Sequence, residues 1–245
     1  MLRFIRIAAV AATLSLMPAA SLGLAAPKTD VRATPTVARA PVKPAPAPEF
    51  GLGTAHAQES GLAPGQTAED FKAWLARSPA NRAELQGFRD YLAAAGVESV
   101  VPLWQLVRTS SSWRACGAQP FEAPPADKWK HIVTTLKFVR DEVVPAVGKV
   151  EVLSGYRNDK LNTCSNGAPQ SAHRHFFALD LTPVSKTVAR NDMIRSICAA
   201  HARDGRAYDA GLGFYTGKRF HVDSNGFRKW GPNGKGATSP CVGYV

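Results

Sequence analysis

The chain has 245 residues, 45% of them hydrophobic, and this length excludes a peptide too small to bury a core of its own. Its formal net charge is +11, and the excess lies mainly after residue 66, where 24 basic and 16 acidic residues remain. Such a balance favours anionic partners, although charge alone does not choose among cell-wall glycan peptides, anionic lipid headgroups and nucleic acid.

The N-terminus has the layout of a secretory signal peptide. MLRFIR supplies Arg3 and Arg6, the apolar run IAAVAATLSLM follows, and the small residues PAASLGLAA come next. We assign residues 1–26 to this signal, with Gly23-Leu24-Ala25 as the cleavage sequence. An uncleaved anchor is the alternative, but the apolar run is short for a membrane span. We therefore expect an exported, periplasmic or cell-envelope protein with no stable membrane span after cleavage.

Residues 27–66 are rich in Pro, Ala, Thr and Gly, most clearly in PVKPAPAPEF. This composition predicts a disordered linker before a folded domain over residues 67–245.

The first part of that domain, residues 67–145, is predicted to be helical. TAEDFKAWLAR reads as a helix with Thr67 as its N-cap, and a second helix is expected from Asn81 to Gly96. VVPLWQLVRT stays unassigned. DKWKHIVTTLKFVRDEVV has the clearest helical periodicity. Its apolar stripe consists of Trp129, Ile132, Val133, Leu136, Val139 and Val143.

Residues 146–245 change to strand patterns. KVEVLSG, FALDLTP, GLGFY and RFHVDS read as short strands, interrupted by a helix over roughly 187–203. Helices followed by strands predict an α+β fold, with N-terminal helices packed on a small antiparallel sheet.

The cysteines fit an oxidising compartment. There are four, an even set without a CxxC pair, and they allow three pairings. Chain proximity alone favours Cys116–Cys164 and Cys198–Cys241, of which the second would tie down the C-terminal tail.

Two strand segments carry the residues of chemical interest. SAHRHFFALD contains His173, His175 and Asp180, and FHVDSNGFRKW contains His221 with Asp223 two residues later, on the same strand face. Zinc accepts nitrogen and oxygen ligands, and a catalytic site keeps three protein ligands plus a water, whose pKa falls to about 7. The alternative is that these side chains form a polar network without a metal.

The ordered segments SGYRNDKLN, SAHRHFFALD and GLGFYTGKRFHVD, with a tryptophan following, resemble the zinc D-alanyl-D-alanine carboxypeptidase-type peptidases. Those enzymes cleave cell-wall peptides and share a fold with lysostaphin-type endopeptidases and the hedgehog domain. The resemblance covers roughly residues 149–232. Ser171, His173, Ala178 and Asp180 match the family pattern S-x-H-x-x-G-x-A-x-D. It implies a Zn²⁺ ion held by His173, Asp180 and His221.

Further roles follow from the resemblance. Arg157 of SGYR would bind substrate and stabilise negative charge at the scissile carbonyl, because an oxyanion in a dry site needs a fixed donor. Ser171 and Trp230 would bind substrate, with Trp230 lining the cleft or packing under the zinc histidine. His175 would be a surface or supporting residue, or else a ligand or proton carrier.

The sequence departs from the family pattern in two places. Phe176 replaces the glycine of the middle motif and is expected to reshape the cleft. Many relatives carry a catalytic Glu or His two or three residues before the last zinc histidine, where this chain has Lys218 and Arg219. Asp223 is then the nearest candidate, either as general base or as the partner that orients His221. His175 is a third candidate base.

These observations predict an exported zinc peptidase that hydrolyses peptidoglycan stem peptides, as a carboxypeptidase or an endopeptidase. The expected partners are peptidoglycan peptides and not nucleic acid. The rival hypothesis is a non-catalytic wall-binding or partner-binding module with a structural zinc.

Overall fold

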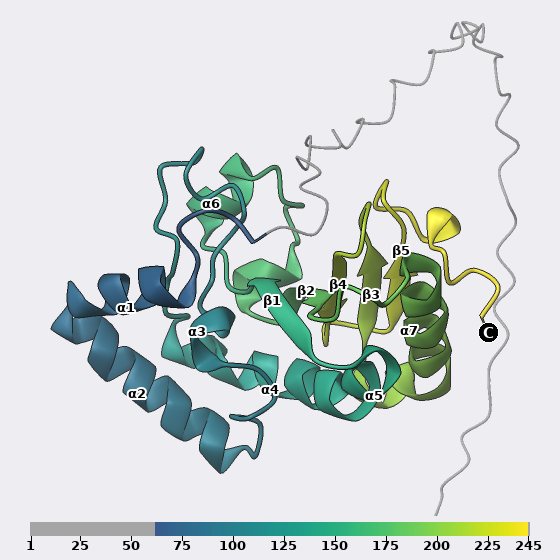
Figure 1. Ribbon diagram of the computed structural model, residues 1–245, viewed down its shortest axis with the longest axis horizontal. Helices are drawn as coiled ribbons and strands as arrows, with labels where there is room; N and C mark the ends of the chain where they lie inside the picture. The colour runs from purple at the N-terminus through teal and green to yellow at the C-terminus, as the bar shows by residue number, and fades with distance from the viewer. Residues whose placement is uncertain (1–61, 245) are drawn as a thin grey trace, which may run out of the picture. The chain divides into compact units, whose positions relative to one another are not determined.

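One five-stranded sheet lies at the centre of residues 62–244, the part of the chain that the computed structural model describes (Figure 1). The strands are β1 (Val150–Ser154), β2 (Ala178–Pro183), β3 (Gly211–Phe214), β4 (Phe220–Asp223) and β5 (Arg228–Trp230). Their order in the sheet is β1-β2-β4-β3-β5. The predicted α+β class is confirmed. An antiparallel sheet was predicted, and the sheet is antiparallel except that β5 pairs with β3 in parallel.

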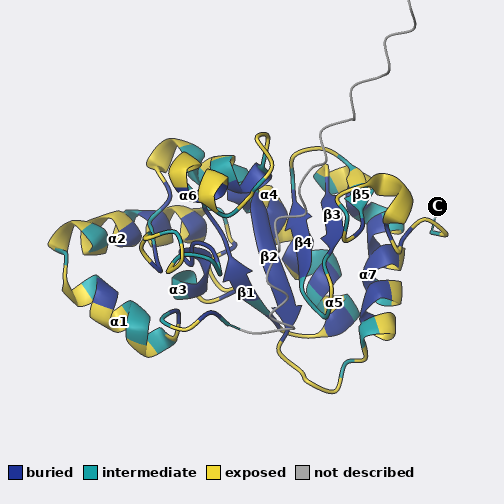
Figure 2. Ribbon diagram, turned by 90° about the horizontal axis from the view of Figure 1, so that it is seen from above, coloured by how far each residue is buried: buried dark blue, intermediate teal, exposed yellow. Residues whose placement is uncertain are grey.

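The register between β2 and β4 brings the polar residues of the two motifs together. Asp180 of β2 lies opposite His221 of β4, and Ala178 lies opposite Asp223. Every residue of both strands is buried, as the dark central strands of Figure 2 show. A strand buried on both faces reads as a nearly continuous apolar run, so a carboxylate and an imidazole within it stand out.

Each of the two N-terminal helices begins directly after a residue whose side chain caps it. Helix α1 (Ala68–Ala76) starts after Thr67, whose hydroxyl accepts from the backbone N–H of Asp70 while the Asp70 carboxylate accepts from Thr67. Helix α2 (Pro79–Ala94) starts two residues before the predicted Asn81. Ser78 caps this helix and the following proline suits its first turn.

The longest predicted helix is interrupted. A 3₁₀ turn (Ala126–Lys128) leads into α4 (Trp129–Phe138), a π-helical turn (Val139–Val143) and α5 (Val144–Val147). Pro145 lacks an N–H and its ring crowds the preceding turn, which accounts for the widening there. The predicted stripe still faces the core. Its buried members are Ile132, Leu136, Val139 and Val143.

The remaining helices flank the sheet. The predicted helix near 187–203 is α7 (Arg190–Asp204), which lies beside the β5 side of the sheet in Figure 1. Two short helices were not predicted: α3 (Leu103–Leu106), within the unassigned VVPLWQLVRT, and α6 (Asp159–Cys164).

Two disulfides fasten this domain. Cys116 bonds to Cys164 and Cys198 bonds to Cys241, the pairs that chain proximity favours. Disulfides are typical of an oxidising, extracytoplasmic environment. Within residues 62–244, no helix is both long and apolar enough to cross a bilayer.

The packed part of the chain begins before the expected boundary at residue 67. Ala63 and Gln66 are buried, and the Gln66 side chain donates to the carbonyl of Pro120 at 2.7 Å. The end of the predicted linker therefore belongs to the domain. The predicted signal peptide and residues 27–61 of the linker lie outside the described residues.

Candidate metal site

Three buried side chains converge at the centre of the sheet. His173 comes from a 3₁₀ turn (Ala172–His175), Asp180 from β2 and His221 from β4, and their exposed fractions are 1%, 1% and 5%. His173 Nε2 lies 3.4 Å from Asp180 Oδ1 and 3.2 Å from His221 Nδ1. His221 Nδ1 lies 3.2 Å from the same Asp180 oxygen. We call these three residues the metal group.

The spacing of these atoms fits a small divalent ion. Tetrahedral zinc with bonds of 2.0–2.1 Å separates neighbouring ligand atoms by about 3.3 Å, close to the three distances in the metal group. Two imidazole nitrogens and one carboxylate oxygen are also ligands that zinc accepts, although other first-row metals accept them too. The group can therefore hold a metal ion whose identity the geometry leaves open.

Each histidine ring is oriented by a hydrogen bond on its other nitrogen. His173 Nδ1 lies 2.7 Å from the carbonyl oxygen of Gly155, so Nδ1–H donates and the lone pair of Nε2 faces the group. A side chain at Gly155 would meet the Leu106 carbonyl oxygen at 2.4 Å, and only glycine permits this close approach. His221 Nε2 lies 2.8 Å from Asp223 Oδ2, which leaves Nδ1 for the group.

Asp223 is fully engaged on the far side of His221. Arg228 donates to both of its carboxylate oxygens, at 2.9 Å to Oδ1 and 2.7 Å to Oδ2, and the backbone N–H of Asn225 donates to Oδ1 at 2.8 Å. Of the two roles expected for Asp223, this geometry matches the orientation of His221. A general base would need an oxygen near the Nδ1 side of that ring.

Asp180 divides its two oxygens between different partners. Oδ1 faces the two histidines and accepts from the Tyr215 hydroxyl at 3.0 Å. Oδ2 accepts from Arg219 Nη2 at 2.6 Å, and Arg157 Nη2 lies 3.6 Å away. Neither contact was predicted: Arg219 stands where many relatives of the resembled family carry a base, and Tyr215 lies in no predicted role.

The protonation states in this cluster suit metal binding. Burial and the positive charge of Arg157 lower the pKa of His173 to about 4. Burial raises the pKa of Asp180, but the charge of Arg219 and the contacts with His173 outweigh it and hold that pKa well below its usual value. At neutral pH the group therefore offers a neutral imidazole and a carboxylate.

His221 and Asp223 behave as a hydrogen-bonded pair. Burial lowers the pKa of His221, but its bonds to Asp180 and Asp223 outweigh burial and raise that pKa above its ordinary value. Burial likewise raises the pKa of Asp223, and its bond to His221 with the charge of Arg228 brings it to about 2. A metal at Nδ1 must therefore displace a proton held by His221.

Trp230 packs against a histidine of the metal group, whereas Phe176 packs in the core after the turn that carries His173. The Trp230 ring centroid lies 5.4 Å from that of His221, and a Cβ at Gly213 would meet this indole at 2.0 Å. Phe176 adopts the left-handed conformation with φ of 58° where the resemblance pattern has glycine. Its ring is fully buried beside Phe88, so it fills the core.

The other predicted residues lie at different distances from the metal group. Arg157 is adjacent, and its Nε is buried without a hydrogen-bond partner in the described structure. Ser171 is half-buried at the start of the turn that carries His173. His175 is exposed, and no hydrogen bond among residues 62–244 joins its ring to the metal group.

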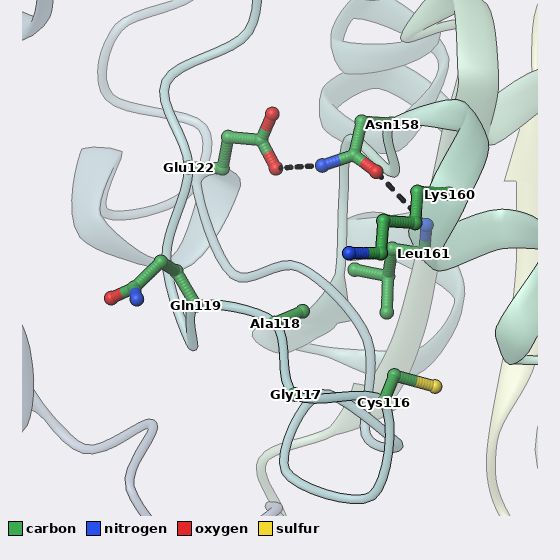
Figure 3. Close-up of a pocket in the computed structure, with 8 residues that line it drawn as sticks. All are labelled: Cys116, Gly117, Ala118, Gln119, Glu122, Asn158, Lys160 and Leu161. Carbon is green, nitrogen blue, oxygen red and sulfur yellow. Dashed lines mark hydrogen bonds between the residues drawn. The ribbon is translucent and has the colours of Figure 1, made fainter.

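Two hollows lie apart from the metal group. One, of about 280 Å³, lies between the loop around Gly117 and the start of α6 (Figure 3). The other, of about 570 Å³, reaches Trp74 and shares Gln119 and Glu122 with the first. Glu122 accepts from Asn158 Nδ2 at 2.7 Å in the first hollow. Neither hollow is lined by a residue of the metal group.

Comparisons with protein-family models, with curated proteins and with solved structures find no match for this chain. The metal group is therefore supported by its own geometry and by the sequence motifs that supply it.

Proposed function

We propose that this protein is an exported zinc peptidase that hydrolyses amide bonds in peptidoglycan stem peptides. The observation that carries the proposal is the convergence of His173, Asp180 and His221 at zinc-ligand spacing, with both imidazoles oriented by outer hydrogen bonds. These residues come from the segments that resemble the zinc D-alanyl-D-alanine carboxypeptidase-type peptidases. The resemblance supplies the substrate class, and a D-amino acid at the scissile bond is part of the proposal.

The chain's own residues supply the positioning that amide hydrolysis needs. A bound zinc ion contributes a water of lowered pKa, near 7. Arg157 is the donor for the oxyanion or for a substrate carboxylate, because its guanidinium lies at the group with Nε unpaired. Asp223 acts by holding His221 in the tautomer that presents Nδ1. Trp230 packs against the His221 ring, with the two ring centroids 5.4 Å apart.

A second candidate function is a non-catalytic module with a structural metal, which would bind wall peptides or a partner protein. Two observations favour it. All three residues of the metal group are buried, and Asp223, the nearest candidate base, is occupied by Arg228. A structural site is closed, whereas a catalytic site keeps one position for water.

Digestion of purified peptidoglycan distinguishes the two functions. The full chain, loaded with zinc, is incubated with cell-wall fragments and with synthetic stem peptides, and products are identified by mass spectrometry. We expect cleavage that a chelator abolishes and zinc restores. His173→Ala should lose cleavage, whereas Lys218→Gln, which removes a charge bonded to the Lys186 carbonyl, should retain it. Binding to wall fragments without cleavage would support the non-catalytic module instead.

The position of the new end identifies the type of peptidase. Release of a single C-terminal residue indicates a carboxypeptidase, and cleavage within a cross-link indicates an endopeptidase. The basic charge that follows residue 66 would favour docking on the anionic wall, so cleavage of intact wall should weaken with rising salt while cleavage of small neutral peptides should not.

A further inference from the structure

Arg219 makes the shortest polar contact to the metal group. Its Nη2 donates to Asp180 Oδ2 at 2.6 Å, whereas Arg157 approaches the same oxygen only to 3.6 Å. The other oxygen, Oδ1, faces both histidine nitrogens. The two oxygens of one carboxylate are thus divided between the guanidinium and the place a metal would take.

We infer that Arg219 is a positioning residue that presents Asp180 to the metal through a single oxygen, and that Ser111 holds Arg219 in place. The terminal torsion of an aspartate is broad, so an unrestrained carboxylate samples one-oxygen and two-oxygen binding. A charge-assisted hydrogen bond to Oδ2 fixes the plane of the carboxylate and excludes the second mode. The inference rests on the proposed function only in requiring that the metal group binds a metal.

Ser111 connects the Arg219–Asp180 pair to the N-terminal half of the domain. Arg219 Nη1 donates to Ser111 Oγ at 2.9 Å, across 108 residues of sequence. The loop around Ser111 is itself fixed: Gly155 N–H donates to the Arg108 carbonyl at 2.8 Å, and Ser154 Oγ donates to the Thr109 carbonyl. The disulfide from Cys116 to Cys164 closes the far side of this loop.

The fork of Arg219 is therefore held at three places. One nitrogen contacts Ser111 and another contacts Asp180, and the guanidinium carbon lies 5.3 Å from the centre of the Tyr215 ring. Tyr215 in turn donates to Asp180 Oδ1. A long side chain loses rotamer freedom when it is ordered. Because these contacts already order the Arg219 side chain, less freedom is lost when its guanidinium binds the Asp180 carboxylate.

The inference predicts an effect opposite to that of simple electrostatics. A guanidinium close to a cation site repels the cation, so its charge alone should weaken metal binding. If charge were the whole role, Arg219→Gln would bind zinc more tightly. If Arg219 is a positioning residue, Arg219→Gln should instead bind zinc more weakly, because loss of a partner that orients a metal ligand weakens metal affinity about 10- to 100-fold.

The test measures zinc affinity of the full chain by competition with a chromogenic chelator, without any substrate. We expect Arg219→Gln to weaken binding about 10- to 100-fold. Arg219→Lys keeps the charge but replaces the two guanidinium nitrogens that contact Ser111 and Asp180 with a single ammonium nitrogen, so its loss should be intermediate. Ser111→Ala should give a smaller loss of the same sign. Lys218→Gln removes an equal charge one residue away and should stay within about twofold of wild type.

The absorption spectrum of the Co²⁺-substituted protein gives a second readout. Its intensity reports coordination number, so a two-oxygen carboxylate in Arg219→Gln should lower the intensity relative to wild type, with Arg219→Lys closer to wild type. Circular dichroism of each metal-free variant checks that the fold is intact. If Arg219→Gln fails this check, Ser111→Ala decides, and wild-type affinity and spectrum in that variant would overturn the inference.

Three outcomes separate this inference from the proposed function. Metal binding with the expected order of variants, but no cleavage of wall peptides, supports the inference and contradicts the peptidase. Cleavage by a protein whose Arg219→Gln variant binds zinc as tightly as wild type, or more tightly, overturns the inference alone. A wild-type chain that binds no zinc overturns both.

Discussion

Binding of zinc at pH 5.5 should release one proton from the protein, because the two histidines of the metal group begin in different states. With a pKa of about 4, His173 is only about 3% protonated at this pH. With a pKa raised above its ordinary value of 6.5, His221 is at least about 90% protonated. Asp180 is already ionised and releases no proton. A zinc-bound water with a pKa near 7 is only about 3% ionised at this pH and adds little to the release.

The expected release is therefore about 0.9 to 1.0 proton per zinc ion, whereas two histidines with ordinary pKa values would release about 1.8. Isothermal titration calorimetry in buffers of different ionisation enthalpy measures this number directly as the slope of the observed enthalpy. Asp223→Asn removes a partner that raises the pKa of His221, so its release should fall below one. A value near two, or near zero, for the wild type would refute the assigned protonation states.

Three further perturbations test the structure around the metal group. Asp223→Asn should lower zinc affinity about 10- to 100-fold in a chelator competition, and unchanged affinity would show that His221 needs no outer partner. Loss of the Cys116–Cys164 disulfide, with its sequence separation of 48, should lower the free energy of unfolding by about 4 kcal/mol in urea titrations. A loss under about 1 kcal/mol would contradict this prediction, because it would mean that breaking the disulfide adds little conformational freedom to the unfolded chain. Phe176→Ala should lower the free energy of unfolding by about 3–5 kcal/mol. Phe176→Gly should be at least as stable as Phe176→Ala, because glycine adopts the φ of 58° at this position without strain. A clearly less stable glycine variant would show that the left-handed backbone carries no strain.

Much of the metal group was predictable because its residues lie in short segments with regular geometry. His173 and Asp180 are seven residues apart in one motif, and strand alternation placed Asp223 on the face of His221. The same alternation contained a signal for Arg219, which lies two residues before His221. An arginine at this position cannot act as the expected base, but it can contact a carboxylate on the neighbouring strand.

Other features depend on contacts between distant parts of the chain. Ser111 meets Arg219 because its loop packs against the end of β1, and no local pattern encodes that approach. The parallel pairing of β5 with β3 likewise follows from the return of the chain after β4. The π-helical turn before Pro145 was not predicted, but it has a local cause, since a proline within a helix removes one hydrogen bond of the ladder.

The central claim is that His173, Asp180 and His221 together bind a divalent metal. The most direct test is the zinc content of the purified full chain by elemental analysis, beside His221→Ala and Lys218→Gln. We predict near-stoichiometric zinc in the wild type and in Lys218→Gln, and its loss in His221→Ala. A wild-type chain that remains zinc-free under metal-replete conditions, with its fold intact, would contradict the claim and leave a buried polar network in its place.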